Sequence, residues 1–424
     1  MNLFDQNFQL IHRLTLLFFG FCSFTGIAQE IIEIAEPSHI KTVVFEANSK
    51  DTYIPVIQLG QKLSFSFDDL EGDQKIYYYR IDHCEYNWQK SSLLSTEFIA
   101  GYQEDRLRDF ENSFNTLQPY THYTLQIPNR DMQLKISGNY LLSVLDQYRN
   151  TVFTRRFIVY QPLVDVGVSV HRSRNIEYIN QKQDVEFRIN LGNLQVRNPY
   201  QDIQVMVLKN WDWNSALYNI PPKYVNNNQL LYNYVSEISF WGDNEYLYFD
   251  TKEIRNATNN IRQTRMLDIF NTFLYIDQER RNMPYTVYPD INGNFAVRNL
   301  DGNQSLLETD YSLVHFKLET TAELNGKDLY VFGNYNNWQI GDQNKMIYNN
   351  KTNLFELSLP FKQGFYNYLY VAADQQGKID KKAIEGSYYQ TENEYVVVVY
   401  FKQFGDRFTQ VIGIGSGNSE ILRN

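Results

Sequence analysis

Short runs in which apolar and polar residues alternate recur along the whole chain. Runs of this kind begin at Val43, Lys62, Lys75, Tyr123 and Tyr140. A period of two places apolar side chains on one face of a strand, as in antiparallel sheets with one face in a core. Glycine or asparagine stands in the turns between runs, where hairpins need positive φ angles. The pattern predicts an all-β fold of tandem antiparallel β-sandwiches.

Aromatic content supports the same prediction. The chain of 424 residues contains 33 Tyr and 28 Phe, and Phe, Tyr and Trp together make up 16% of it. Aromatic side chains favour pleated, half-buried surfaces, so almost all regular structure should be strand. At about 150 residues per domain, this length predicts two or three domains.

Interruptions in the alternation divide the chain into domains of the immunoglobulin or fibronectin kind. Pro162 separates two strand-like runs, which predicts a boundary near Leu163. An Asn-rich segment from Trp211 to Asn233 contains two prolines, and we expect it to form a long loop. The predicted segments are a first sandwich over 29–163, a second over 164–318, a third over 319–414 and a flexible tail over 415–424.

The N-terminus has the three-part layout of a secretory signal. Arg13 precedes an apolar stretch from Leu14 to Phe24, and small residues follow up to Ala28. We therefore expect residues 1–28 to be a signal peptide that is removed. The apolar stretch is shorter than the roughly 20 residues of a membrane-spanning helix, and no later stretch is a better candidate. The mature protein is expected to be soluble.

Charge and cysteine content limit the partners and the means of stabilisation. The formal net charge is -10, and removal of residues 1–28 takes away one acid and one base. So acidic a chain is a poor ligand for nucleic acid. Phe21 precedes Cys22 where a lipid-attachment motif needs a small residue, so we do not expect lipidation. Cys84 is then the one cysteine left, and no intramolecular disulfide can form.

No motif in the sequence indicates catalysis or a cofactor. His83 and Cys84 are neighbours, but consecutive side chains of a strand point to opposite faces, so they do not pair as base and nucleophile. The histidines of the mature chain lack the spacings of metal sites. They are His39, His83, His122, His171 and His315. Paired glycosidase carboxylates meet only in the folded chain, so a β-sandwich glycosidase is the last-ranked hypothesis. We predict no enzyme, no cofactor and no metal site.

Two acidic segments are interpreted as turns. Asp68, Asp69, Glu71 and Asp73 do not follow the spacing of a calcium loop, in which alternate oxygens surround a fixed glycine, and a solvated turn is favoured. The segment Asp290–Asn294 is interpreted as a type I′ turn first and an ion site second.

The Asn-rich segment supplies the candidates for partner contact. Trp211 and Trp213 stand at its start, and Tyr218 and Tyr224 lie within it. Large aromatic side chains dominate many protein interfaces, so these four are the candidate anchors. The alternative for the two tryptophans is that they cap the second sandwich.

The segment DLYVFGNYNNW, Asp328–Trp338, and the Tyr-rich strand after it resemble the immunoglobulin-like modules that include the glycogen-binding family. In sugar-binding members, the Trp of NNW stacks on the glycan and a second Trp follows the Tyr-rich strand. Here the matching segment, Asp374–Asp380, contains no aromatic residue. Trp338 is therefore a candidate for residual glycan stacking, with corner packing as the alternative. This resemblance implies an alternative function, a secreted carbohydrate-binding protein.

Five segments occur in an order and spacing that resemble the type IX secretion system plug protein family. They are RIDHCEYNW (Arg80–Trp88), SFNTLQPYTHY (Ser113–Tyr123), FWGDNEYLYFD (Phe240–Asp250), YPDINGNFAVRN (Tyr288–Asn299) and ETDYSLVHFKL (Glu308–Leu318). The resemblance covers the mature chain up to Leu318, and none of the segments is a catalytic signature.

This resemblance implies a non-enzymatic periplasmic protein that is associated with the outer membrane through the large β-barrel translocon of the type IX system. Its implied action is steric closure of the barrel when the barrel's carrier partner is not engaged. The resemblance does not say which residues contact the barrel.

Overall fold

The computed structural model describes residues 33–47, 54–300 and 306–423. The predicted signal peptide, residues 1–28 with Cys22, lies outside them. The protein is mostly β, with 47% strand and 5% helix, and its strands form several antiparallel sheets. The predicted all-β fold class is confirmed. No helix in the described part of the chain is both long and apolar enough to cross a membrane.

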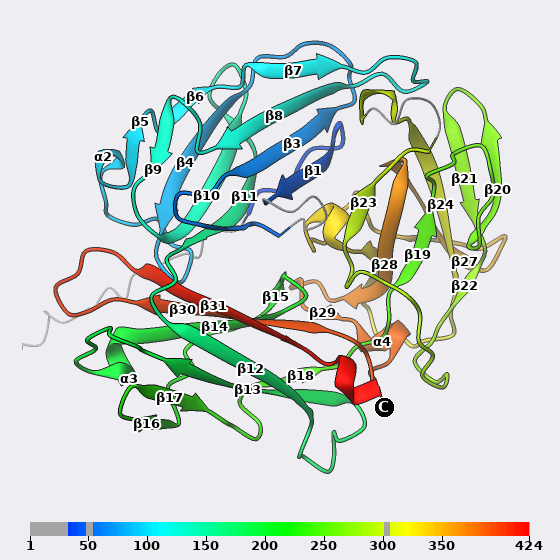
Figure 1. The fold of residues 1–424 in the computed structure, drawn as a ribbon. Helices are drawn as coiled ribbons and strands as arrows, with labels where there is room; N and C mark the ends of the chain where they lie inside the picture. Colours follow the sequence, from blue (N-terminus) through cyan, green and yellow to red (C-terminus); the bar gives the residue numbers. More distant parts are fainter. Residues whose placement is uncertain (1–32, 48–53, 301–305, 424) are drawn as a thin grey trace, which may run out of the picture.

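The first unit is a sandwich of two sheets, which Figure 1 shows in blue and cyan. One sheet has the order β1, β3, β8, β7 and the other the order β2, β11, β10, β4, β6, while β5 pairs with β9 beside helix α2. The elements are β1 (Ile40–Glu46), β2 (Val56–Gln58), β3 (Leu63–Asp69), β4 (Tyr78–Cys84), α2 (Ser95–Phe98), β5 (Ile99–Gly101), β6 (Glu104–Arg106), β7 (Asp109–Asn112), β8 (Thr121–Ile127), β9 (Met132–Leu134), β10 (Gly138–Leu145) and β11 (Thr151–Tyr160).

Cross-strand aromatic pairs fill the core of the first unit. The alternation in β3 points Phe65 and Phe67 inward, and Phe67 lies opposite Tyr123 of β8. Their rings stack with centroids 5.1 Å apart and 11° between planes. Phe153 of β11 meets Phe67 edge-on at 5.4 Å from the facing sheet. Such pairs stabilise a sandwich beyond the area that they bury.

The second unit combines strands from two distant parts of the chain. One sheet has the order β12, β13, β17, β16 with β18 also on β13, and the other the order β15, β14, β30, β31. The elements are β12 (Asp165–Arg172), β13 (Lys182–Asn190), α3 (Pro199–Asp202), β14 (Ile203–Lys209), β15 (Asp212–Leu217), β16 (Tyr224–Asn226), β17 (Gln229–Tyr232), β18 (Ser239–Trp241), β30 (Glu394–Phe401), β31 (Gln410–Asn418) and η3 (Glu420–Arg423).

The third unit is inserted between β18 and β30. In one of its two sheets, β28 pairs with β19, β23, β25 and β29. The other sheet has the order β20, β21, β24, β27, β26, with β22 also paired to β24. The elements are β19 (Leu247–Asp250), β20 (Ile261–Met266), β21 (Phe270–Leu274), β22 (Asp277–Gln278), β23 (Phe295–Val297), η1 (Leu306–Glu308), β24 (Tyr311–Glu319), β25 (Asp328–Phe332), η2 (Asn334–Asn336), β26 (Ile347–Asn349), β27 (Leu354–Lys362), β28 (Gly364–Ala373), β29 (Ile379–Asp380) and α4 (Lys382–Glu385).

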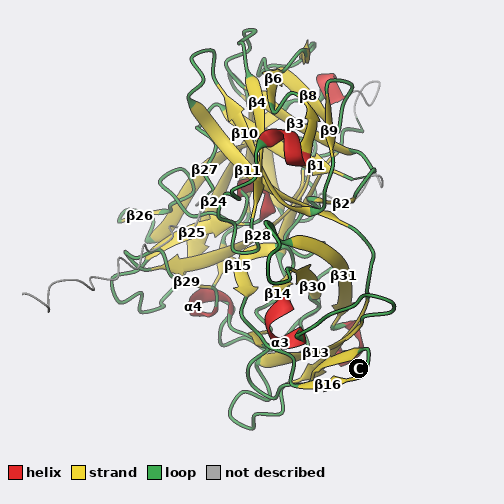
Figure 2. Ribbon diagram, turned by 90° about the vertical axis from the view of Figure 1, so that its left-hand side faces the viewer, coloured by secondary structure: helices red, strands yellow, loops and turns green. Residues whose placement is uncertain are grey.

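The units are not consecutive, which differs from the sequence expectation of sandwiches over 164–318 and 319–414. Strands β14 and β30 pair along their whole length, from Ile203 opposite Phe401 to Lys209 opposite Tyr395. The C-terminal strands thus complete the second unit, and the third is an insertion from Leu247 to Glu385. Pairing between strands almost 200 positions apart leaves no local pattern in the sequence. Figure 1 and Figure 2 show the first unit above the second.

The expected long loop also differs from the structure. The Asn-rich segment contains β15, β16 and β17, with left-handed Asn219 and Asn227 in its turns. Asparagine tolerates this backbone conformation better than most residues, so a high Asn content marks tight turns here as well as loops.

The expected flexible tail is partly regular structure. Its residues 415–418 are the end of β31, which pairs with β30 and packs on β12, and Glu420–Arg423 form η3. Gly413, Gly415 and Gly417 alternate along one face of β31, next to Val164, which precedes β12, and to Val166 and Val168 of β12. The glycines allow the two strands to approach closely, which is a packing role rather than a sign of fraying.

This contact predicts that Gly415→Val destabilises the protein. A Cβ atom at Gly415 would lie 2.5 Å from the carbonyl oxygen of Val166, and backbone cannot move aside as a side chain can. Overpacking of this kind costs about 1–3 kcal/mol, so the urea midpoint should fall accordingly. Gly341→Ala is the control, because a Cβ there meets nothing within 4 Å. Equal midpoints for both variants would contradict the packing role.

Candidate functional site

The candidate functional region consists of the junctions between the three units, where most of the residues singled out in the sequence lie. The first–second junction is an apolar cluster. Its buried members are Cys84, Trp88, Leu141 and Ile158 from the first unit and Met206, Leu208, Trp211, Val396, Val398, Tyr400 and Val411 from the second. A common core of this kind resists relative movement of the two units.

Three tryptophans stand at the edge of this junction. Trp213 meets Trp88 edge-on with ring centroids 5.1 Å apart, and Trp211 lies 6.5 Å from Trp213. The guanidinium of Arg156 lies 4.9 Å from the centroid of the Trp88 ring, a cation–π contact. The tryptophans therefore cap the second unit against the first, the alternative left open by the sequence.

The four candidate anchors separate in the structure. Trp211 is buried, while Trp213 and Tyr218 are half-buried, and Tyr218 packs edge-on against Tyr86 of the first unit. Tyr224 lies apart from them on edge strand β16 with 55% of its surface exposed. The structure thus brings three candidates together at the first–second junction and leaves Tyr224 exposed on an edge strand.

Trp338 is buried as well, with 1% of its surface exposed. It packs against Phe332 at 5.4 Å and Tyr246 at 6.0 Å, and a Cβ on Gly293 would come within 2.1 Å of its ring. A ring enclosed in this way has no free face for a sugar. Trp338 therefore has the corner-packing role.

The first–third junction is held by a buried polar network around Asp68. The Asp68 carboxylate accepts hydrogen bonds from Lys362 Nζ at 2.8 Å and from the Tyr311 hydroxyl at 2.6 Å. His122 Nδ1 lies 2.6 Å from its other oxygen. Burial alone raises the pKa of Asp68, but the Lys362 ammonium and the His122 contact outweigh it and hold the pKa below its ordinary value.

The acidic segment that begins at Asp68 was expected to be a solvated turn, and this interpretation is wrong for its first two residues. Asp68 and Asp69 are both fully buried at the end of β3. Asp69 accepts a hydrogen bond from the Tyr77 hydroxyl at 2.8 Å and pairs with Lys75 at 3.0 Å. Sequence does not reveal such partners, because a carboxylate in a turn and one in a junction look alike.

The Asp68 network predicts a strong effect of Asp68→Asn. The substitution keeps the shape but leaves the buried Lys362 ammonium without its counter-charge, a loss of about 3–5 kcal/mol in the free energy of unfolding. Because the Asp68 pKa is lowered in the folded state, the advantage of the wild type is present at neutral pH and shrinks as pH falls. Urea unfolding at pH 7 and pH 4 measures both effects.

Asp109→Asn, on an exposed position of edge strand β7, is the control for that experiment. It should change the free energy of unfolding by less than about 0.5 kcal/mol at either pH. If Asp68→Asn behaves like the control, the network does not hold the two units together.

The second–third junction contains a further ion pair, in which Lys381 of the third unit lies 2.8 Å from Asp212 of the second. Beside it, Lys209 lies 2.5 Å from Asp243, which belongs to the link between β18 and β19. Burial lowers the pKa of Lys381, but Asp212 and its acidic neighbours reverse the effect and raise the pKa above its ordinary value. All three junctions are therefore closed, one by apolar packing and two largely by paired charges.

The predicted type I′ turn at Asp290–Asn294 has the backbone that this turn needs, with φ of 55° at Asn292 and 81° at Gly293. Asp290 accepts hydrogen bonds from the backbone nitrogen of Tyr246 at 2.7 Å and of Asn292 at 2.9 Å. Burial, together with the neighbouring Glu245 carboxylate, raises the pKa of Asp290 to about 7.

This raised pKa predicts a pH-dependent effect of Asp290→Asn. The folded state binds the Asp290 proton more tightly than the unfolded chain does. Its contribution to stability is fully present below about pH 4 and is lost as pH rises through about 7. Relative to Asp290→Asn, the wild type should therefore lose about 1–3 kcal/mol of unfolding free energy between pH 4.5 and pH 8.

Urea unfolding across this pH range measures the effect, with the exposed Asp165→Asn as the control. A constant difference between the wild type and Asp290→Asn would show that Asp290 does not titrate in the folded state.

His83 and Cys84 point to opposite faces of β4, as expected. His83 packs among the rings of Phe98, Tyr140 and Phe408, and burial lowers its pKa to about 4. Cys84 belongs to the first–second junction, and burial raises its pKa to about 12. A thiol of this kind is inert. Among the described residues, no group of three or more His, Cys, Asp or Glu side chains is placed to hold a metal ion.

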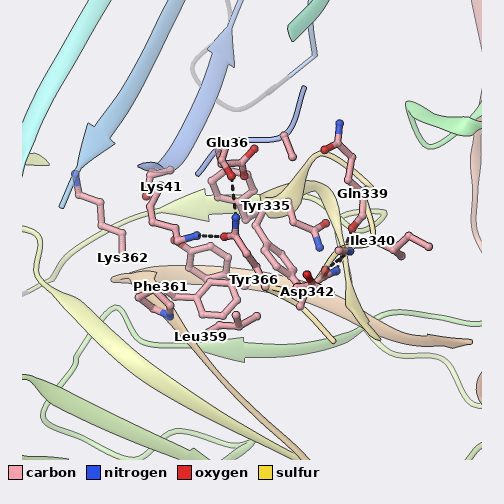
Figure 3. A pocket seen from close by; sticks show the side chains of 18 residues that line it. Glu36, Lys41, Tyr335, Gln339, Ile340, Asp342, Leu359, Phe361, Lys362 and Tyr366 are labelled. Atoms are coloured by element: carbon pink, nitrogen blue, oxygen red, sulfur yellow. Dashed lines mark hydrogen bonds between the residues drawn. The ribbon is translucent and has the colours of Figure 1, made fainter. Parts of the chain in front are cut away.

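A cavity lies between the first and third units, and we call it the junction pocket (Figure 3). Its volume is about 410 Å³. The first unit contributes Ala35, Glu36, Lys41 and Thr42, and the third contributes β27 and the segment from Tyr335 to Asn344. No sequence motif indicated this pocket, because its residues come from four separate parts of the chain, Phe295 and Tyr366 among them.

Comparison with known proteins gives two matches. Residues 40–161, which include β1 to β11, match the family described as type 9 secretion system plug protein 1st domain. A hypothetical protein from Parabacteroides merdae, with a crystal structure at 2.30 Å resolution, is 30% identical in sequence with a TM-score of 0.87. The match covers 92% of this chain and 100% of that chain. No curated protein matches the chain significantly in sequence.

Proposed function

Because the chain belongs to the type IX secretion system plug protein family, we propose that it is a periplasmic plug that closes the outer-membrane barrel translocon of that system by filling its mouth. The closed state would be the one in which the carrier partner of the barrel is not engaged. The family is a structural component of secretion, so the proposed action involves no catalysis and no cofactor.

The observation that carries this proposal is the closure of all three junctions between the units. A channel wide enough for folded proteins leaks small solutes unless its stopper keeps its shape. Apolar packing at the first–second junction and buried ion pairs at the other two tie the units into one body. Such a body can enter and leave an opening as a whole, without unfolding.

The surface that meets the barrel must bind firmly and still release. Reversible interfaces are mixed polar and aromatic rather than continuously apolar. Among the candidate anchors, Tyr224 retains the exposure that a contact needs, and Lys223 beside it lies 5.7 Å from its ring. We propose this edge of the second unit as a contact with the translocon.

Deletion of the gene tests the proposal. Entry of a large antibiotic or dye that intact outer membranes exclude should rise in the deletion strain, and the wild-type gene should restore exclusion. Purified barrel should co-elute with the wild-type chain, most strongly when the carrier partner is absent, and should do so less with Tyr224→Ala. Tyr102→Ala, at an exposed position of the first unit, is the matched control. Unchanged dye entry in the deletion strain would count decisively against a sealing role.

The alternative of a secreted carbohydrate-binding protein depended on Trp338. Because that ring is enclosed by Phe332, Tyr246 and the turn at Gly293, no observation in the third unit favours glycan stacking on it.

A further inference from the structure

The junction pocket has the dimensions and floor of a small-molecule site. Its volume of about 410 Å³ falls within the roughly 300–1,000 Å³ of such sites. Figure 3 shows Leu359, Phe361 and Tyr366 together at its floor, beneath Tyr335. These side chains offer an apolar surface at which a chain or ring system would lose its contact with water.

Lys41 provides a cation at the wall of this apolar site. Its Nζ atom donates a hydrogen bond to the Gln343 side-chain oxygen at 3.1 Å, and the described residues bring no carboxylate within 4.0 Å of it. The Glu36 carboxylate, which also lines the pocket, is engaged by Arg155 at 2.5 Å. Partial burial lowers the pKa of Lys41, with Glu36 opposing. The Lys41 side chain is partly covered and its bond to Gln343 is open to solvent, so its ammonium can pair with an anion that enters the pocket.

The backbone beside Lys41 is strained, and this strained segment forms part of the pocket wall. Thr42 has φ of 52°, a left-handed conformation that is a genuine outlier for a β-branched residue, at the bulge of β1. Its hydroxyl lies 2.5 Å from that of Tyr311, which in turn bonds Asp68. The Asp68 network therefore holds the strained turn at the pocket wall, and strain maintained by surrounding structure is typical of ligand sites.

A second polar group at the pocket is the Tyr335 hydroxyl. Tyr335 lines the pocket, and its hydroxyl is buried with no hydrogen-bond partner among the described residues. Gln343 links the two walls, because its amide nitrogen donates to the backbone oxygen of Glu36 at 2.9 Å while its oxygen accepts from Lys41. A ligand head at Lys41 would replace only the hydrogen bond from the Lys41 ammonium to the amide oxygen of Gln343.

We propose that the junction pocket binds a small amphipathic carboxylate, whose apolar chain or ring lies on the aromatic floor and whose head pairs with Lys41. The carboxylate supplies a counter-ion to Lys41, and a hydrogen bond from the ammonium to an anionic oxygen replaces the one that Lys41 donates to the neutral amide oxygen of Gln343. This site is independent of the proposed plug function, because it requires only the contact between the first and third units.

Calorimetric titration of the mature chain with three probes of equal chain length tests the inference. Dodecanoate, below its critical micelle concentration, should bind once per chain and raise the unfolding temperature. Dodecanol has no charge and dodecyltrimethylammonium has the opposite charge, so each should bind at least about tenfold more weakly. Dodecanoate binding that is absent, multiple per chain or equalled by dodecanol would overturn the proposal.

Variants locate the binding. Lys41→Gln should weaken dodecanoate binding by about tenfold or more and leave that of dodecanol unchanged. Lys351→Gln, at an exposed lysine outside the pocket, is the matched control and should bind as the wild type does. Leu359→Trp enlarges a side chain of the apolar floor while Lys41 is kept, and it should abolish binding of dodecanoate. Full binding by either Lys41→Gln or Leu359→Trp would place the ligand elsewhere, with circular dichroism showing that each variant is folded.

Discussion

Strand β30 is the element on which the rest of the structure depends, because its two faces belong to two different cores. One face packs into the second unit through Tyr395, Val397, Val399 and Phe401. The other face forms the first–second junction through Val396, Val398 and Tyr400. Apolar burial on both faces of β30 fixes the first unit to the second. Because β30 pairs with β14, the chain must come back to the second unit after the inserted third unit.

The junctions that involve the third unit depend on charge instead. Asp68 and Lys362 are nearly inaccessible to solvent and Lys381 is mostly covered, and each is matched by a partner from another unit. A buried pair of this kind adds little net stability compared with apolar packing, but removal of one member is costly. Such contacts specify one relative arrangement of the units, since any displacement leaves a charge unpaired.

The sequence predicts the strands well and their long-range arrangement poorly. Alternation in β3 marks Phe65 and Phe67 as core residues, and the structure places both there. The run that forms β30 is apolar on both faces, so its alternation between two cores cannot be seen in the sequence alone. The insertion of the third unit follows from that same pairing, which no local signal records.

The candidate site was predictable only in part, for a related reason. Trp211 and Trp338 are large aromatic residues near turns, and sequence alone does not distinguish a ring that caps a junction from one that faces solvent. Asp68 resembled a solvated turn residue because its partners, His122, Tyr311 and Lys362, lie 54, 243 and 294 positions away. Residue type set the chemistry of the site, while partners distant in the sequence set its burial.

The contrast between apolar packing at the first–second junction and ion pairs at the junctions of the third unit accounts for the position of the junction pocket. Apolar packing between units leaves few voids, because side chains adjust until the interface is dense. Ion pairs fix the separation of two walls by the length of their hydrogen bonds, so a cavity beside them can persist. Asp68 of β3 lies opposite Lys41 of β1, and Lys362 ends β27, so the Asp68–Lys362 pair stands beside two strands whose residues line the pocket. A ligand that binds only when these walls are together would stabilise the first–third junction by mass action, so pocket occupancy and rigidity of the whole body are coupled.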